Sequence, residues 1–288
     1  MPRRSTRLTD LTPVCSNFYP VSMVRRTDRH DGGDNKMKIL IAGELPFIDE
    51  VERLCRRAAH DVRVFLVEDF LGAVEAGYEL DGMSEVEIAI ELHNESAAAK
   101  QELLLAMGTM LPDDALILTS CLATSATQAA SWTDRPERVV GFAVLPPVPD
   151  EGIIELAEAL QTDESALVQA ELFWRGLGQE TIIVADGPGL VRARTVCCLI
   201  NEAASLLMEG VATAADIDKA MRLGMNYPIG PLAWADVIGL DAVLGVMTGL
   251  FEEWGDDRYR PSPLLRRMVA ANLLGQKTGR GFFTYEDA

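Results

Sequence analysis

Apolar residues in the first half of the chain gather in short runs separated by helical patterns. From residue 47 to 58 they recur at three- and four-residue intervals, which is the period of an amphipathic helix. Residues 96–111 and 164–177 are also helix-like, with Ser96 as a candidate N-cap. The apolar runs predict strands at residues 38–43, 61–68, 85–92, 115–121, 138–145 and 181–186. Strands alternating with helices predict an α/β domain with a parallel sheet.

The pattern changes after Gly187. Residues 191–208 form one long helical stretch, and Thr213 is placed to cap a further helix. Three more helical segments follow, and no strand is expected before residues 281–285. We therefore predict an α/β domain over residues 37–186 and an all-α domain over residues 187–288.

Residues 1–36 differ from the rest of the chain in charge. They carry seven Lys and Arg against four Asp, a net charge of +3, so residues 37–288 carry −21. They contain few apolar residues and lack the apolar core of a signal peptide. We expect a disordered tail. Two alternatives are a start at Met37, where the first strand begins, and a transit peptide.

Charge and cysteine usage exclude several classes of function. The net charge of −18 argues against binding to nucleic acid or to anionic membranes, and no apolar run has the ~18–20 residues of a membrane span. The five cysteines form no CxxC pair, and the three histidines are scattered, so no metal site is expected. This composition favours a reducing compartment, and we predict a cytoplasmic location.

Six ordered segments in the second half carry a resemblance to a known family. They are PGLVRAR (188–194), NEA (201–203), EGVATAADIDKAM (209–221), YPIGPL (227–232), DVIGLD (236–241) and GQKTGRGFF (275–283). Together they resemble the 3-hydroxyacyl-CoA dehydrogenases, and most of all those acting on 3-hydroxybutyryl-CoA. The resemblance covers roughly residues 37–286.

This resemblance implies a Rossmann-like NAD-binding domain, shortened here, followed by a helical domain that dimerises. The implied cofactor is NAD, and the implied partners are an acyl-CoA and a second copy of the chain. The implied reaction is the NAD-dependent oxidation of 3-hydroxyacyl-CoA to 3-ketoacyl-CoA in fatty acid metabolism.

Several residues that the family uses for this chemistry differ in this chain. Hydride transfer from an alcohol needs a base for the hydroxyl proton. The resemblance places the family's catalytic histidine on Ala143, which cannot accept a proton. It places the family's two asparagines on Pro146 and Ala193, and its Asn-Thr-Ser-Ser run on residues 120–123. Arg194 remains.

Glu155 matches the glutamate that orients the histidine in the family, and we predict it as the remnant of that pair. As a base on its own it would lie roughly 5 Å too far from the substrate to reach the proton. The alternative interpretation is a polar residue at the end of a helix or strand.

The segment IAGELPFIDEV (41–51) matches the position of the family's dinucleotide loop. Gly43 keeps the first glycine, whereas Leu45 and Ile48 replace the other two. Their side chains, together with acids at positions 44, 49 and 50, put bulk and negative charge where a pyrophosphate needs bare backbone and a helix N-terminus. The family's ribose-binding aspartate falls on Leu66, although Glu68 and Asp69 are candidate substitutes.

Further weak candidates follow the third strand. Glu91, Glu95 and Lys100 match family positions, and the last two imply contacts near the cofactor ribose and the substrate. The alternative is a solvated loop and helix start, where an acid is favourable in any case. His93 is a candidate replacement base.

Two other candidate residues are better explained by structural roles than by catalysis. His60 fits a structural role before the second strand, and Cys121 fits a small buried thiol better than a nucleophile. Only about 20 residues separate Leu66 from the third strand, so the helical excursion with which the family helps to bind coenzyme A is missing.

Three hypotheses remain open at this stage. The favoured one is a family member with weak or no activity, acting as a non-catalytic dimerising or regulatory partner. The second is an active dehydrogenase. The third is a different enzyme on the same plan that uses Lys100 or His93 as its base.

Overall fold

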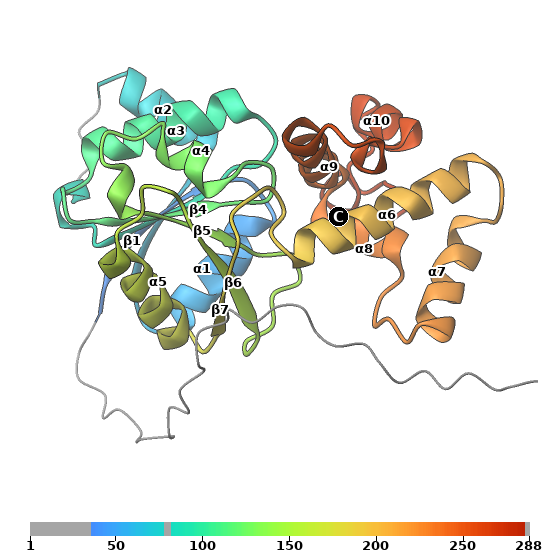
Figure 1. Cartoon of the computed structure of the whole chain (residues 1–288), viewed down its shortest axis with the longest axis horizontal. Helices are drawn as coiled ribbons and strands as arrows, with labels where there is room; N and C mark the ends of the chain where they lie inside the picture. Colours follow the sequence, from blue (N-terminus) through green and yellow to red (C-terminus); the bar gives the residue numbers. More distant parts are fainter. Residues whose placement is uncertain (1–35, 78–81, 286–288) are drawn as a thin grey trace, which may run out of the picture. The chain divides into compact units, whose positions relative to one another are not determined.

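The structure is a computed structural model that describes residues 36–77 and 82–285 (Figure 1). Nearly all of the predicted N-terminal tail lies outside these residues. The first part of the described chain is a seven-stranded sheet in the order β2-β1-β3-β4-β5-β6-β7. Its strands are β1 (Lys38–Gly43), β2 (Asp61–Leu66), β3 (Ile88–Leu92), β4 (Leu116–Ser120), β5 (Val139–Ala143), β6 (Ile153–Glu158) and β7 (Glu180–Val184).

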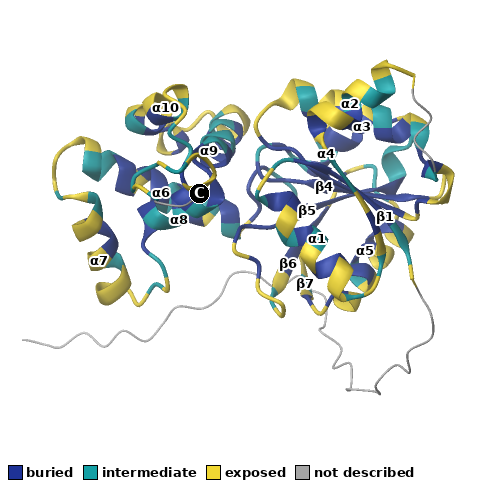
Figure 2. Cartoon of the chain, turned by 180° about the vertical axis from the view of Figure 1, so that it is seen from behind, coloured by how far each residue is buried: buried dark blue, intermediate teal, exposed yellow. Residues whose placement is uncertain are grey.

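Helices cover both faces of this sheet, as Figures 1 and 2 show. One face carries α2 (Val67–Glu75), α3 (Ala97–Met110) and α4 (Ala126–Ala130). The other carries α1 (Phe47–Arg57) and α5 (Glu164–Gly176). Strands β3, β4 and β5 are buried along their whole length (Figure 2), because helices on both faces exclude water from them. The predicted α/β architecture is confirmed.

The second part is helical, as predicted. It contains α6 (Arg192–Met208), α7 (Ala214–Gly224), α8 (Pro231–Ile238), α9 (Leu240–Trp254) and α10 (Pro263–Ala270). Four 3-10 turns, η1 (Met83–Glu85), η2 (Pro136–Arg138), η3 (Asp257–Tyr259) and η4 (Gln276–Thr278), complete the described elements. The boundary predicted at residues 186/187 falls in the loop between β7 and α6.

Local signals explain why several helices begin where they do. Ser96 accepts a hydrogen bond from the Ala99 N–H at the start of α3, and Thr213 accepts one from Asp216 at the start of α7. One hydrophobic cluster joins the sheet to α6, α8, α9 and α10, and a smaller cluster packs α7 around Ile217. The two parts of the described chain therefore share a core.

The structure corrects the sequence analysis at two places. Strand β6 was not predicted, and it pairs antiparallel with β5, so the sheet is not wholly parallel. Its sequence contains good helix formers, and tertiary pairing overrides that propensity. The strand predicted at residues 281–285 is wrong: apart from an isolated bridge at Thr284, the backbone N–H groups of Phe282 and Phe283 donate to the Asp236 carboxylate at 2.8 Å each.

Two further helices, α2 and α4, were not predicted; α2 begins at Val67, within the segment predicted as the second strand, and α4 has only 5 residues. Within the described residues, no single helix is long and apolar enough to span a membrane; α8 and α9 reach that length only as a pair bent by 99°.

Candidate cofactor and active site

Gly43 ends β1 and lies against the end of β3. A Cβ atom at this position would lie 2.5 Å from Leu92 Cβ and 2.6 Å from the Leu92 carbonyl carbon. The glycine is therefore required by the contact between the two strands. This close approach explains why Gly43 is a glycine without invoking a ligand.

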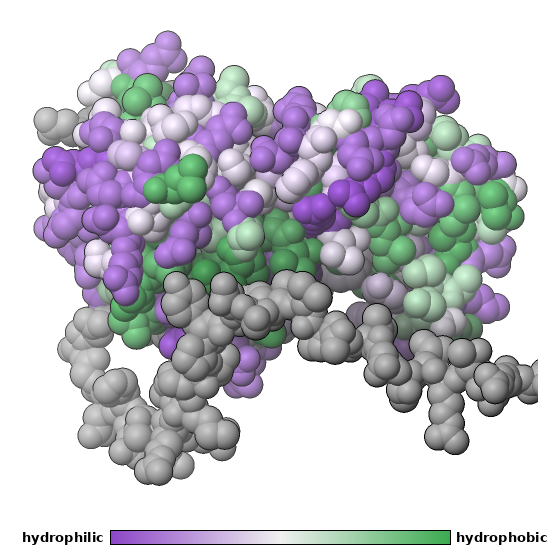
Figure 3. Space-filling model, in the orientation of Figure 1, coloured by the Kyte–Doolittle hydropathy of each residue, from purple (hydrophilic) through white to green (hydrophobic). Residues whose placement is uncertain are grey.

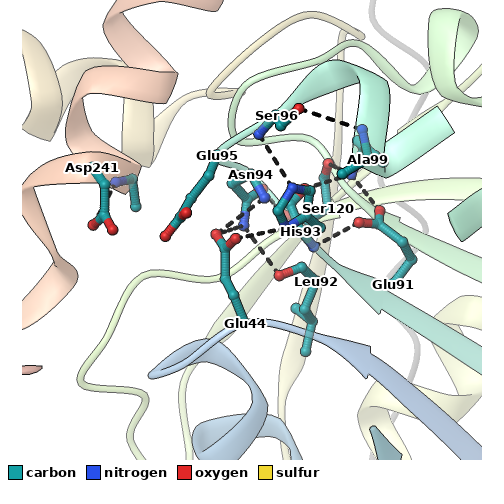
Figure 4. Close-up of polar contacts among 12 residues, drawn as sticks. Glu44, Glu91, Leu92, His93, Asn94, Glu95, Ser96, Ala99, Ser120 and Asp241 are labelled. Atoms are coloured by element: carbon teal, nitrogen blue, oxygen red, sulfur yellow. Dashed lines mark hydrogen bonds and ion pairs between the residues drawn. The ribbon is translucent and has the colours of Figure 1, made fainter. Parts of the chain in front are cut away.

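Glu44, the next residue, spans from the β1 loop to the loop after β3 (Figure 4). Its Oε1 accepts hydrogen bonds from the backbone N–H of Asn94 at 3.0 Å and from the Asn94 side chain at 3.4 Å. Its Oε2 lies 2.8 Å from Nδ1 of His93. A protein carboxylate thus occupies donors at the carboxyl edge of the sheet, where parallel-sheet proteins bind their ligands.

Both ring nitrogens of His93 are engaged. Nε2 accepts a hydrogen bond from the Ser96 N–H at 3.2 Å, so we assign the proton to Nδ1, which faces Glu44. Burial lowers the pKa of His93, but the carboxylates of Glu44 and Glu91 outweigh burial and leave the pKa raised. With the first proton on Nδ1, a proton taken from a substrate would have to bind Nε2, and it would break the hydrogen bond from Ser96.

The start of α1 offers few free N–H donors. Pro46 has none, and the N–H of Ile48 donates to the Glu44 carbonyl at 3.1 Å. Asp49 and Glu50 fill the first turn and satisfy the helix dipole. Ile48 is buried in the core, which corrects the expectation that its side chain occupies the phosphate position. Leu45 is 44% exposed and faces the adjoining cavity.

That cavity has a volume of about 570 Å³. Aliphatic side chains of Leu45, Leu66, Leu71 and Leu274 line it, with the charged residues Glu68, Glu95 and Lys277 among its polar groups. Of the two acids predicted to stand in for the ribose-binding aspartate, Glu68 lines the cavity.

Lys100 lines a second, smaller cavity that is described below, and it is 2% exposed. Its Nζ forms an ion pair with Glu91 and donates to the carbonyls of His93 at 3.1 Å and Ser120 at 2.9 Å. Thr119 adds a hydrogen bond to Glu91 at 2.7 Å. All three ammonium protons are used, so Lys100 holds the loop after β3 to β4.

Glu155 lies on β6, directly opposite Ala143 on β5. Its carboxylate accepts the N–H of Val191 at 3.0 Å and the N–H of Arg192 at 2.9 Å. Glu155 therefore caps α6, at the joint between the sheet and the helices.

A second cavity, of about 400 Å³, lies between the loops after β3 and β4 and helix α9. Here α9 comes unusually close to the sheet. A Cβ at Gly245 would lie 2.6 Å from the Asn94 carbonyl oxygen, and one at Gly249 would overlap the Ala123 carbonyl oxygen. The two glycines therefore allow α9 to rest on both loops.

Comparisons with known proteins agree with this architecture. The NAD-binding domain of 3-hydroxyacyl-CoA dehydrogenase matches residues 47–187, and the C-terminal domain of the same enzyme matches residues 189–285. A probable 3-hydroxybutyryl-CoA dehydrogenase of Bacillus subtilis is 37% identical over 77% of each chain. The chain belongs to the 3-hydroxyacyl-CoA dehydrogenase family.

Other relatives support the assignment. The 3-hydroxybutyryl-CoA dehydrogenase of Bradyrhizobium diazoefficiens is 36% identical over 76% of this chain and 74% of its own length. The crystal structure of (S)-3-hydroxybutyryl-CoA dehydrogenase from Ralstonia eutropha has a TM-score of 0.71, is 31% identical, and covers 88% of this chain and 100% of its own. The chain thus has the NAD-binding and C-terminal domains of NAD-dependent dehydrogenases.

The β1 loop differs in residues and in charge from a glycine-rich dinucleotide-binding loop. Glu44 holds the donors of the β3 loop, Leu45 faces the cavity, and the first turn of α1 is acidic. One carboxylate ~4 Å from a phosphate charge costs about 4 kcal/mol at an effective dielectric constant of 20. The loop follows the first strand of the sheet, the place of the dinucleotide loop in a Rossmann-like fold, and it carries carboxylates.

The remaining candidates have structural partners. Cys121 is fully buried, and burial raises the pKa of its thiol far above its usual range. His60 accepts a hydrogen bond from the Met37 N–H at 3.3 Å through Nδ1. Arg194 stacks on Trp254 and Tyr259 and bonds the Tyr259 hydroxyl.

Three residues of the site were missed by the sequence analysis. Asn94 accepts the Ser120 hydroxyl at 2.7 Å, and Lys277 contacts both Glu95 and Asp241. Lys277 and Asp241 lie inside two of the six segments that carry the family resemblance, and this position could have marked them as candidate site residues. Among the described residues, no group of three or more His, Cys, Asp or Glu is placed to hold a metal ion.

Proposed function

We propose that this member of the family keeps its two-domain scaffold but has weak or no dehydrogenase activity. The observation that carries the proposal is the pair Ala143 and Glu155. By resemblance, the catalytic histidine belongs at Ala143, between Glu155 and the substrate. A methyl group stands there, and the Glu155 carboxylate is directed to backbone N–H groups of α6.

No second base near the site supports turnover. His93 uses one ring nitrogen toward Glu44 and the other toward Ser96. The Lys100 Nζ is buried, and it is taken up by an ion pair with Glu91 and by the carbonyls of His93 and Ser120, so it is not directed toward a substrate.

The cofactor loop supports the same proposal independently. Dinucleotide binding in this fold relies on backbone N–H groups and a helix N-terminus that face the pyrophosphate. Here Glu44 takes up donors of the β3 loop, and acids occupy the first turn of α1. We infer that NAD binds far more weakly than to an active family member.

The acyl-CoA part of the site is also reduced. Helix α9 rests on the Ala123 carbonyl through Gly249, in the loop where the family places hydroxyl residues that contact its substrate. Between β2 and β3 the described residues contain α2 and the short η1, where the family has its longer excursion. An acyl-CoA would therefore have fewer contacts here.

We further propose that the chain acts as a dimer, either with itself or with an active dehydrogenase. Apolar side chains at the end of α6 and around α7 are exposed: Val211 is 64% exposed, Leu223 73% and Met225 65%. Figure 3 shows hydrophobic surface over this part of the molecule. A role as a dimerising or regulatory partner in the cytoplasm would need this surface and not the catalytic residues.

The test combines binding and turnover. NAD and NADH are titrated calorimetrically into the protein, and NADH oxidation is followed with acetoacetyl-CoA, with the Ralstonia eutropha enzyme as positive control. We expect no turnover above the blank and a dissociation constant weaker than about 100 μM, or about −5.5 kcal/mol. Turnover near that of the control, or tight NADH binding, would support an active enzyme instead.

A further inference from the structure

Lys277, in η4, joins the helical part of the chain to the sheet-bearing part. Its Nζ lies 3.0 Å from Oε1 of Glu95, in the loop after β3, and it also forms an ion pair with Asp241 in the first turn of α9. The Glu95 and Asp241 side chains point toward one another (Figure 4). Two carboxylates thus share one ammonium group.

This contact lies between the two cavities. Glu95 lines both, while Lys277 lines the 570 Å³ cavity and Asp241 lines the 400 Å³ cavity. Glu95 therefore stands between the two cavities, at one of the contacts between α9 and the β3 loop.

The charges around Glu95 are mostly negative. Glu44 faces it from the β1 loop, Asp241 and Glu252 from α9, and Glu68 from α2 across the larger cavity. Lys277 is the one cation in direct contact with Glu95 among the residues that the structure describes, and His93 nearby is paired with Glu44. The surplus of carboxylates around Glu95 favours the protonated form of its side chain.

We propose that Glu95, Asp241 and Lys277 form a pH-sensitive latch that is closed when Glu95 is protonated and loosens as it ionises. In the closed state the Glu95 carboxyl shares its proton with Asp241, and Lys277 balances the remaining charge. Loss of the proton leaves two carboxylates side by side at a contact between α9 and the sheet.

The titration of Glu95 supports this geometry. Burial, its hydrogen bond with Asp241 and the charges of Glu44 and Asp241 raise its pKa from 4.5 to about 7, although Lys277 opposes them. Because the folded-state pKa is raised, the stabilisation is complete below about 4.5 and is lost as the pH rises through about 7. The latch therefore opens on the alkaline side of neutrality.

Hydrogen exchange of the full chain between pH 6 and pH 8.5 tests the latch. After correction for the intrinsic rate, we expect exchange in residues 93–97 and in the first turn of α9 to rise about threefold or more. Glu95→Gln keeps a hydrogen-bonding group without the titration, so exchange in the first turn of α9 should be slow and independent of pH in this variant. Lys277→Met should raise exchange above wild type at pH 8.5.

Glu171→Gln is the matched control, because it removes a carboxylate from an ion pair within α5. It should retain the wild-type pH dependence at α9. If Glu95→Gln does not fold, Asp241→Asn removes the same carboxylate pair and should also abolish the dependence. A wild-type protein without pH dependence at α9, or a Glu95→Gln variant with unchanged dependence, would refute the latch. This readout does not depend on whether the protein binds NAD.

Discussion

Ala143 and Glu155 lie directly opposite one another in the antiparallel pair of β5 and β6. The carboxylate that would orient a histidine in an active relative is instead bonded to the first N–H groups of α6. The residue that resembles a catalytic remnant therefore has a structural task at the joint between the sheet and the helices.

Replacement of Glu155 should lower stability. Glu155→Ala removes a 5%-exposed carboxylate and leaves the Val191 and Arg192 N–H groups without their partner. We expect the free energy of unfolding to fall by about 2 kcal/mol, measured by urea titration. Glu158→Ala, at an exposed position on the same strand, should change it by less than about 0.5 kcal/mol. Equal effects of the two variants would contradict the capping role.

Restoring the histidine should not restore activity. Ala143→His supplies a base, but Glu44 keeps its hydrogen bonds with Asn94, and Glu155 remains bonded to α6. We expect NADH oxidation with acetoacetyl-CoA to stay at the blank, and a stability loss of about 1–3 kcal/mol from overpacking at a buried position. Robust turnover in a folded variant would show that the cofactor site is intact.

The contact between Glu44 and His93 should make stability depend on pH. The raised pKa of His93 means that its stabilisation is complete below the unfolded value of about 6.5 and is lost as the pH rises through the folded value. Glu44→Gln should therefore cost more stability at pH 6 than at pH 9. Glu52→Gln, from an exposed pair with Arg56, should show no such difference. Denaturant titrations at both pH values test this.

Gly249 should not tolerate a side chain. Gly249→Ala places a methyl group against the Ala123 carbonyl, and we expect a loss of about 1–3 kcal/mol, despite the better helix propensity of alanine. Gly72→Ala is the matched control within α2, where an added Cβ meets nothing within 4 Å. It should gain about 0.5–1 kcal/mol. Thermal unfolding of both variants would separate the two effects, and a neutral Gly249→Ala would argue against the close approach.

The proposed dimer can be tested by light scattering. The wild type should have the mass of two chains, and Leu223→Glu should shift it toward the mass of one, because a buried charge at an apolar interface is costly. Leu160→Glu changes a leucine that is 92% exposed in the sheet-bearing part, and it should leave the mass unchanged. A monomeric wild type would rule out the homodimer, leaving mixed dimers to be tested separately.

Local patterns in the sequence determined most of the elements. Helices α1, α3, α6 and α7 follow from apolar periodicity and from caps such as Ser96 and Thr213. The buried strands follow from continuous apolar runs. These signals act over a few residues, so they can be detected without the tertiary structure. Strand β6 was not predicted, because its pairing with β5 and β7, and not its own composition, makes it a strand.

The resemblance of the sequence also predicts which family residues are replaced, such as the histidine position at Ala143. Only the tertiary structure decided what the remaining polar residues do. Glu44 meets a residue 50 positions away, Glu155 caps a helix 37 positions away, and Lys277 meets a carboxylate 182 positions away. The role of a charged side chain depends on the group that it contacts. That group is determined by the packing of the whole chain, because the partners are far apart in sequence.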